Sequence, residues 1–326
     1  MDMYEIPLSV IIPTYNRPQF LPRMLDSVLA QTFRDYELIL INNGSTEDVT
    51  EEQCRVYAQK DNRIRLFSLK ENEGPSRARN LGIAESKGEY IIHLDDDDYC
   101  EPNHLSLLME LIIKHHADIA VSGCVDEIDG VIRPKHAYEG TYVWDSAQAV
   151  SEFLKREKFH AAPATKLYRK TLFNDVRYVP GRLIDDIHVT YKLFAHGSKA
   201  VAHGVPTYRF RKFEGNTTSF LDKDIVWPEL LEEYFLMQQE RVAYISTLVP
   251  EESAHVRYAA WSYMISMVEK IHLGRGPGCE AQLAYMVEQL CENQQEFMQA
   301  PWMTEREQRL MNAYVLNVPV STQEQP

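Results

Sequence analysis

The chain has 326 residues, of which 44% are hydrophobic and 25% charged, a composition typical of a globular protein rather than a disordered one. Its 34 basic and 48 acidic residues leave a net charge of −14. This charge argues against a chain-wide binder of nucleic acid or of an anionic membrane, since either needs a basic face. The length suggests two domains, or one domain with an extension.

The first 122 residues alternate short β-branched runs with amphipathic stretches, which predicts strands separated by helices. Strands are predicted at 8–13, 36–41, 63–69, 90–94 and 118–122, and helices at 18–31, 47–60, 76–87 and 103–115. Gly88 is predicted to cap the third of these helices. Such alternation predicts a doubly wound α/β sheet, in which ligands bind outside the carboxyl ends of the strands.

The rest of the chain changes character twice. Residues 125–225 contain short strands and Gly/Pro turns, with helices predicted at 146–155 and 185–195. Amphipathic helices are then predicted at 228–247, 253–272 and 280–299. We therefore predict a sheet domain over 1–225 and a helical region over 226–326, which carries −8 of the net charge. These helices are expected to border a substrate, to pack on the first domain or to pair two subunits.

Three polar segments directly follow predicted strands and should converge on one crevice: Thr14–Arg17, Asn42–Ser45 and Asp95–Asp98. Four adjacent carboxylates repel one another at a cost that a divalent cation relieves, and hard oxygen ligands favour Mg²⁺ or Mn²⁺ over zinc. Alternation along the strand would point Asp95 and Asp97 into the crevice together. The alternative is an acidic, solvated turn.

Asp185 and Asp186 form a second acidic site, just before a predicted helix. A carboxylate beside another carboxylate has a raised pKa, which suits a general base that works near neutral pH. The alternative is a helix N-cap. Two basic segments, 72–80 and 208–219, could bind phosphates or these aspartates, or lie plainly on the surface. In the second segment the candidates to clamp a diphosphate are Arg209, Arg211 and Lys212.

The five cysteines are odd in number and have no C-x-x-C spacing, so neither a disulfide framework nor a structural zinc site is expected. The N-terminus lacks the pattern of a signal peptide, and the apolar runs are too short to cross a bilayer. We therefore expect a cytoplasmic protein with reduced thiols and no transmembrane segment.

Together these segments resemble a family 2 glycosyltransferase of the GT-A fold. The resemblance runs over roughly residues 6–220 and leaves out the last hundred. Its segments, in matching order and spacing, are Ser9–Arg17, Ser27–Phe33, Asn72–Ile83, Lys87–Ile91, Leu94–Tyr99, Lys166–Arg169 and Asp185–Asp186. It implies a Rossmann-like, doubly wound mixed sheet with a C-terminal helical extension.

The resemblance also implies a reaction and roles for single residues. A sugar would pass from a nucleotide-diphosphate sugar, with a UDP-sugar as first choice, to an acceptor hydroxyl with inversion at the anomeric carbon. Asp186 matches the catalytic base, and Asp97, in the family's D-x-D segment, would ligate Mn²⁺ or Mg²⁺. The residues expected to bind the donor nucleotide are Pro13, Tyr15, Arg17, Asn42, Asn43, Arg79, Asp95 and Asp96.

The chain departs from the family pattern at two places. Asn42 and Asn43 replace the aspartates that commonly follow the second strand, and an amide that both donates and accepts would alter base recognition. Asp185 stands where glutamate is common. These changes motivate one alternative, a non-catalytic GT-A domain that binds or scaffolds. A nucleotidyltransferase is disfavoured because no glycine-rich phosphate loop follows the first strand.

The implied partners are a nucleotide-sugar donor and a glycan or lipid-linked acceptor, as in surface polysaccharide synthesis. No nucleic-acid partner is expected. The acidity of residues 226–326 argues against docking on anionic lipid, although the resemblance allows peripheral contact at the inner face of the membrane. A homodimer through the C-terminal helices is a further expectation.

Overall fold

The computed structural model describes residues 6–213, 216 and 224–316. The chain divides into two compact units, Met1–Phe213 and Glu214–Pro326, called here the sheet unit and the helical unit. Each unit is described by itself.

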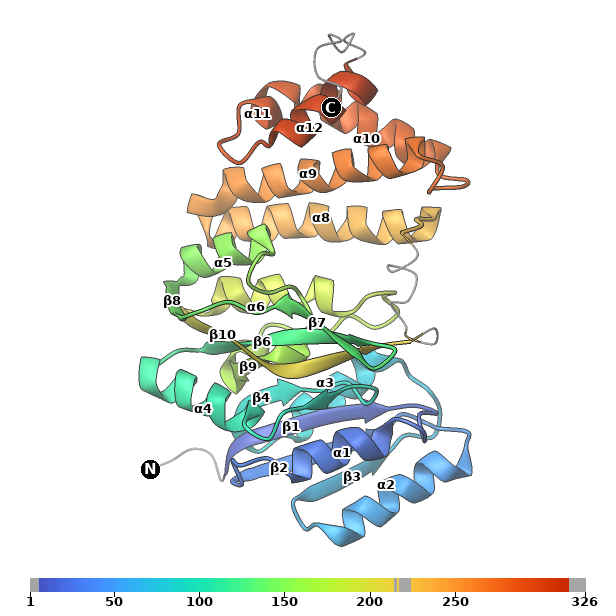
Figure 1. Cartoon of the computed structure of the whole chain (residues 1–326), viewed down its shortest axis with the longest axis vertical. Helices are drawn as coiled ribbons and strands as arrows, with labels where there is room; N and C mark the ends of the chain where they lie inside the picture. The colour runs from blue at the N-terminus through green and yellow to red at the C-terminus, as the bar shows by residue number, and fades with distance from the viewer. Residues whose placement is uncertain (1–5, 214–215, 217–223, 317–326) are drawn as a thin grey trace. The chain divides into compact units, whose positions relative to one another are not determined.

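One half of the sheet unit is parallel. Its strands lie side by side in the order β3, β2, β1, β4 (Figure 1). They are β1 (Ile6–Thr14), β2 (Tyr36–Asn42), β3 (Ile64–Ser68) and β4 (Gly88–His93). Every residue of β2 is buried, as expected for a parallel strand that is covered on both faces. The carboxyl ends of β1, β2 and β4 therefore meet at one edge, where the polar segments begin.

The sheet continues as a mixed sheet through β9, β6, β10 and β5, which confirms the predicted fold class. β9 is antiparallel to both β4 and β6, while β10 runs parallel to β6 and antiparallel to β5 and β8. β7 forms a hairpin with β6. These strands are β5 (Tyr99–Cys100), β6 (Ile119–Ile128), β7 (Val131–His136), β8 (Thr141–Asp145), β9 (Lys166–Arg169) and β10 (Lys199–Lys212).

Amphipathic helices connect these strands. In α1 the buried residues Leu21, Met24, Leu25 and Val28 follow the spacing of one helix face. Asp145 begins α5 by accepting a hydrogen bond from the Gln148 amide in a capping box. The helices are α1 (Leu21–Leu29), α2 (Asp48–Lys60), α3 (Pro75–Glu85), α4 (His104–His115), α5 (Ser146–Lys155) and α6 (Thr190–His196), with short 3₁₀ turns η1 (Pro163–Thr165), η2 (Lys170–Phe173) and η3 (Asp186–His188).

Two local predictions of secondary structure in the sheet unit were wrong, and the helix predicted at 280–299 is broken at Asn293. Gly88 does not cap α3, which ends at Glu85 with Ser86 as its C-cap; Gly88 begins β4, where a Cβ would lie 2.5 Å from the Ser9 amide nitrogen. Glycine is therefore required by close strand packing. The helix predicted at 185–195 is divided into η3 and α6, with Val189 between them.

The helical unit is built around α9, which packs against α8, α10 and α12 (Figure 1). Its elements are α8 (Pro228–Leu248), η4 (Pro250–Glu252), α9 (Ser253–His272), α10 (Glu280–Glu292), α11 (Gln294–Met298), α12 (Glu305–Leu310) and the π-helical turn η5 (Met311–Val315). Trp302 stacks on His255, with ring centroids 4.1 Å apart. Tyr258 donates a hydrogen bond to the Trp302 carbonyl at 2.6 Å, so this aromatic group fixes the chain after α11 onto α9.

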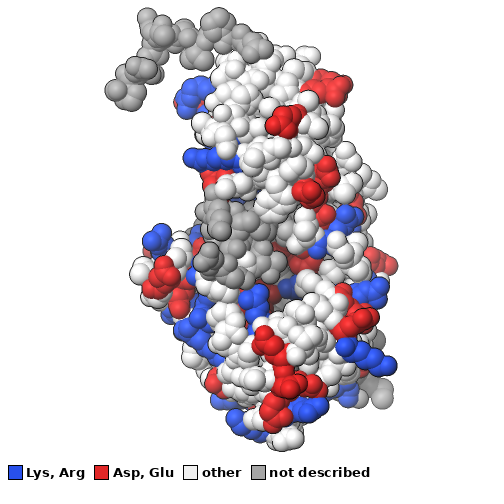
Figure 2. Space-filling model, turned by 90° about the vertical axis from the view of Figure 1, so that its right-hand side faces the viewer, with Lys and Arg blue, Asp and Glu red and all other residues white. Residues whose placement is uncertain are grey.

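The charged side chains and the cysteines are distributed as the composition and the cysteine spacing predict. Figure 2 shows acidic and basic side chains interspersed on one face of the molecule. The cysteines are unpaired, and all but Cys291 are buried. Among the described residues, no helix is long and apolar enough to cross a membrane.

Candidate active site

Two of the three polar loops are joined by hydrogen bonds at the carboxyl edge of the sheet. The Asn43 amide donates to the Thr14 carbonyl at 2.9 Å, and the Asn16 amide donates to Ser45 Oγ at 3.1 Å. Asn16 adopts a left-handed backbone (φ 50°), in which its side-chain oxygen accepts from the Thr46 amide at 2.9 Å. Asparagine tolerates this conformation better than most residues. The loops after β1 and β2 thus form one rigid edge.

The aspartate run forms a turn rather than an extension of β4. β4 ends at His93, and the Asp98 amide donates to the Asp95 carbonyl at 3.4 Å across the turn. The alternation expected for Asp95 and Asp97 therefore does not apply, because it needs an extended backbone. Burial and the neighbouring Asp97 raise the pKa of Asp96 to about 7, while Arg17 opposes the rise. The third loop thus lies within electrostatic reach of the first.

Asp98 anchors the turn to β10. Its side chain is buried and accepts hydrogen bonds from the Tyr208 hydroxyl at 2.9 Å and the Arg211 amide at 2.8 Å. Burial and the charges of Asp97 and Asp95 raise the pKa of Asp98 well above its usual value. Asp98 therefore stabilises the turn, whereas the other three aspartates of the run are half-buried.

Arg79 connects the two acidic sites. It lies on α3 with a side chain that is 8% exposed, donates to Asp95 Oδ1 at 2.7 Å, and forms a second ion pair with Asp185 Oδ2. Its guanidinium carbon lies 5.5 Å from the centre of the Tyr178 ring. Burial alone would lower the pKa of Arg79, but Asp185 and Asp95 outweigh burial and hold the pKa above its ordinary value. Arg79 thus ties the turn after β4 to η3.

Asp186 stands beside this cluster with one oxygen uncommitted. Its Oδ1 atom is shielded from solvent and has no hydrogen-bond partner among the described residues. Burial, and next the Asp185 charge, raise the pKa of Asp186 to about 7, against the opposing effects of Arg79 and Lys166. The N-cap alternative is not supported, because Asp185, at the N-cap position of η3, makes no capping hydrogen bond. Such a carboxylate can accept a proton near neutral pH.

The two asparagines after β2 are committed to hydrogen bonds within the loops. Asn43 is buried; its Nδ2 donates to Asn72 Oδ1 at 3.0 Å, and its Oδ1 accepts from the Glu73 amide at 3.1 Å. Asn42 Oδ1 accepts from the Ser45 amide at 3.1 Å. Asn42 therefore stabilises its own loop, and Asn43 links this loop to the residues that precede α3.

The remaining predicted donor residues follow β1. Pro13 pairs with Ile41 in the β1–β2 register, while Tyr15 is 36% exposed beyond the end of the strand. Arg17 lies 5.9 Å from the Phe20 ring centre and 5.8 Å from that of Phe213. These side chains border the same edge of the sheet.

The basic residues of β10 do not bind the aspartate run through their side chains. Arg209 forms an ion pair with Glu101 at 2.5 Å. The Arg211 guanidinium lies 5.0 Å from the Phe20 ring centre, and only its backbone amide reaches Asp98. The diphosphate clamp considered for this strand thus stays a prediction.

Sequence reasoning assigned no role to Lys166 or to Tyr208. Lys166 is fully buried beside the base candidate, and Tyr208 is fully buried against Asp98. Each of these two residues lies more than a dozen positions from the aspartate that it affects, so the spacing of residues in the sequence could not reveal its role. The place of Lys166 in the segment Lys166–Arg169, which belongs to the family resemblance, was the available hint.

The carboxylates of the aspartate run could bind a metal ion only if a bound substrate supplied further ligands. Among the described residues no group of three or more His, Cys, Asp or Glu side chains is arranged to hold a metal ion. However, Asp96 Oδ2 is buried without a hydrogen-bond partner there, and Asp97 is adjacent. One or two carboxylates completed by phosphate oxygens and water are what Mg²⁺ commonly takes. The residues therefore fit a metal that arrives with a diphosphate.

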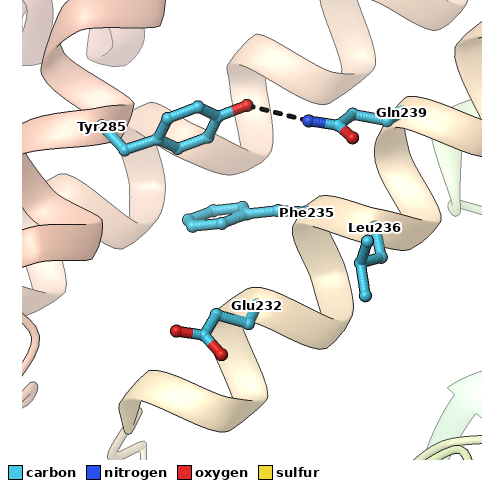
Figure 3. A pocket seen from close by; sticks show the side chains of 5 residues that line it. All are labelled: Glu232, Phe235, Leu236, Gln239 and Tyr285. Atoms are coloured by element: carbon cyan, nitrogen blue, oxygen red, sulfur yellow. Dashed lines mark hydrogen bonds between the residues drawn. The ribbon is translucent and has the colours of Figure 1, made fainter.

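The helical unit has a separate hollow of about 360 Å³ (Figure 3). Gln239 of α8 donates a hydrogen bond to the Tyr285 hydroxyl of α10 at 3.2 Å across it, and Phe235 lies beneath. It is open and mainly apolar, with Glu232 as its charged residue. It offers no group for the chemistry described above.

Comparisons with known proteins identify the family and the fold. The model of the family described as Glycosyl transferase family 2 matches residues 9–177. Glycosyltransferase GlyG of Streptococcus pneumoniae is 30% identical over 247 residues, which cover 70% of this chain and 78% of GlyG. Glycosyltransferase GlyA of the same organism is 29% identical over 230 residues, which cover 68% of this chain but only 32% of GlyA.

Among solved structures, residues 1–349 of TarS from S. aureus, crystallised in complex with UDP-GlcNAc, superpose with a TM-score of 0.69. The superposition covers 94% of this chain and 84% of that one, at 21% sequence identity. This likeness shows the fold.

Proposed function

The chain belongs to glycosyl transferase family 2 and is a glycosyltransferase, and we propose that it inverts the anomeric carbon of a nucleotide-diphosphate sugar as it transfers the sugar to an acceptor hydroxyl. One observation carries this proposal: Asp186 has a partner-free, shielded carboxylate oxygen, next in sequence to Asp185, which Arg79 ties to Asp95 of the third polar loop. A single displacement needs one such base, unlike the carboxylate pair of a retaining glycosidase.

In the proposed reaction Asp186 removes the proton of the acceptor hydroxyl as its oxygen attacks the anomeric carbon. The bond between that carbon and the diphosphate breaks, and its electron pair leaves on the diphosphate. A pKa of about 7 leaves a substantial fraction of Asp186 ionised at neutral pH and makes it a stronger base than an ordinary carboxylate. Arg79 orients the site by holding Asp95 and Asp185 in place.

A divalent metal is part of this proposal. Asp97, with the partner-free oxygen of Asp96 beside it, would hold Mn²⁺ or Mg²⁺ together with the donor's diphosphate. When bound, the metal would stabilise the negative charge that develops on the leaving diphosphate. Asp95 Oδ1 accepts from Arg79, so the expected contact of Asp95 with the nucleotide would use its Oδ2 atom.

For the donor we favour a UDP-sugar of the hexose or N-acetylhexosamine class, supported by the fold shared with TarS, whose structure contains UDP-GlcNAc. Because Asn43 is committed within the loop, we assign base recognition to Tyr15, Arg17 and backbone groups of this edge. The acceptor would be a glycan or lipid-linked hydroxyl in surface polysaccharide synthesis. Unpaired cysteines favour a reducing, cytoplasmic setting, with the inner membrane face as a site of contact.

A panel of nucleotide sugars tests this function. Thermal unfolding and nucleotide release are measured with Mn²⁺ and again with EDTA, for the wild type, for Asp97→Ala and for the exposed control Asp35→Ala. At least one UDP-sugar should raise Tm and release nucleotide with Mn²⁺, and EDTA or Asp97→Ala should remove both effects. Protection without turnover would favour the binding or scaffold alternative, and no protection by any nucleotide sugar would overturn the proposal.

A further inference from the structure

Lys166 is a buried cation for which the reaction above gives no role. It begins β9 with a side chain that is 0% exposed. Its Nζ donates to the Ala162 carbonyl at 2.7 Å and to Thr165 Oγ1 at 3.2 Å, and it forms no ion pair within the described part of the chain. An ammonium has three donors, so one remains uncommitted. The ammonium also lies 5.5 Å from the centre of the Phe159 ring, and a buried lysine without an ion pair is costly.

Lys166 and the segment that carries Asp186 are attached to the same short turn. The Lys166 ammonium closes the turn from Ala162 to Thr165, while the Thr190 hydroxyl donates to the Ala161 carbonyl at 2.7 Å. Thr190 begins α6, four residues after Asp186. Displacing the ammonium would therefore disturb the backbone against which the Asp186 segment is fixed.

Two cations act on the Asp186 charge, Arg79 more strongly and Lys166 after it. Arg79 is engaged by Asp95 and Asp185. Lys166 and Asp186 interact electrostatically, although the described structure places no hydrogen bond between them. Burial lowers the pKa of Lys166 to about 7, and the Asp186 charge opposes that fall. Lys166 thus acts on the Asp186 charge without occupying its Oδ1 atom.

We propose that Lys166 is a positioning residue for sugar transfer, whose buried ammonium keeps the Asp186 carboxylate anionic and in place while leaving Oδ1 open to receive the acceptor's proton. The inference rests on the function proposed above. The acceptor proton passes to Asp186, the acceptor oxygen bonds to the anomeric carbon, and the diphosphate leaves with the electron pair. Lys166 keeps its own protons throughout this step.

The histidines, the cysteine and the tyrosines near the pair are neutral around neutral pH. Facing Lys166, burial lowers the pKa values of His136 and His160 and raises that of Cys124 to about 11, so all three are neutral. The groups that face Asp186 are Asp185, Arg79, Asp95, Tyr168 and Tyr178. Burial raises the pKa values of both tyrosines above their usual range, so they are neutral as well. A pH profile near 7 should therefore report on Lys166 and Asp186 together with Asp96, whose pKa is also about 7, and the Asp96 contribution should be the same in the wild type and in the Lys166 variants.

The first test compares pH profiles of kcat/KM for the wild type, Lys166→Met, Lys166→Arg and the control Lys170→Met. Lys170 lies on η2 and donates to the Ser86 carbonyl, away from Asp186. Loss of the cation should move the acid limb up by about one pH unit, lower kcat/KM at pH 7 about tenfold and leave the donor KM unchanged. Lys166→Arg and Lys170→Met should keep the wild-type midpoint. An equal loss at every pH in Lys166→Met, or a shifted midpoint in Lys166→Arg, would overturn the inference.

A second test needs no activity. Tm is measured for Lys166→Met, Asp186→Asn and the double variant at pH 7 and pH 5. The Tm shifts should be non-additive at pH 7 and additive at pH 5, where Asp186 is protonated and its charge is gone. Additive shifts at both pH values would refute the coupling. Absence of transfer by the wild type would instead refute the proposed function, while this cycle would still decide whether Lys166 acts on Asp186.

Discussion

Replacing Arg79 by methionine tests whether the ion pairs between the two acidic sites hold the sheet unit together. The Arg79 side chain is 8% exposed and bridges Asp95 and Asp185, so the substitution leaves two carboxylates without their cation. Removal of one partner from a buried ion pair costs about 3–5 kcal/mol. We expect the free energy of unfolding of the sheet unit to fall by about that amount at pH 8. The loss should shrink toward pH 5, because burial raises the pKa of Asp95 and this carboxylate can take up a proton once Arg79 is gone.

Arg77 is the matched control for this prediction. It lies two residues away on α3, with a side chain that is 60% exposed and 3.4 Å from Glu73. Because surface pairs contribute about 0–1 kcal/mol, Arg77→Met should have little effect. Hydrogen exchange of the β1 and β4 amides reports the stability of the sheet unit separately from the helical unit. Equal effects of the two substitutions, or an Arg79→Met loss that does not depend on pH, would refute the reasoning.

Three further predictions concern the base and the loop after β2. The wild-type kcat/KM should fall about tenfold per pH unit below about 7, as Asp186 takes up its proton, and a midpoint near pH 4 in the rate profile would contradict this assignment. Asp186→Asn should raise Tm more at pH 8 than at pH 5, because a carboxylate whose folded pKa is raised opposes folding increasingly from its unfolded pKa up to its folded pKa of about 7; calorimetry that shows the reverse order would exclude a raised pKa. Asn43→Asp should lower the free energy of unfolding by about 1–3 kcal/mol in urea titrations, since it sets an acceptor against Asn72 Oδ1, and an unchanged midpoint would show that this contact contributes nothing.

Local sequence patterns were sufficient to predict the framework of the site. Short apolar runs that end in polar residues predicted β1, β2 and β4 and the convergence of their loops, because a buried parallel strand leaves a strong signature. The Asn43–Thr14 and Asn16–Ser45 hydrogen bonds confirm that the first two loops meet.

Contacts between residues far apart in the sequence determine the features of the site that local sequence patterns could not predict. Among the four adjacent aspartates, Asp98 is buried because Tyr208 and Arg211, more than a hundred positions away, supply its hydrogen bonds. Arg79 likewise has one partner close in sequence and another, Asp185, 106 positions away. Neither pairing leaves a periodic trace. The error at Gly88 has a related cause: glycine suits both a helix cap and close strand packing, and the neighbouring Ser9 backbone decides between them.

The most direct test of the central claim is to measure sugar transfer and donor binding together in the wild type and in Asp186→Asn. With Mn²⁺ and a UDP-sugar, the variant should bind the donor with a Kd within about twofold of the wild type but lose about 10²–10⁴-fold in transfer rate, the usual contribution of a general base. Donor binding with undiminished transfer by Asp186→Asn would contradict the assignment of Asp186 as the base.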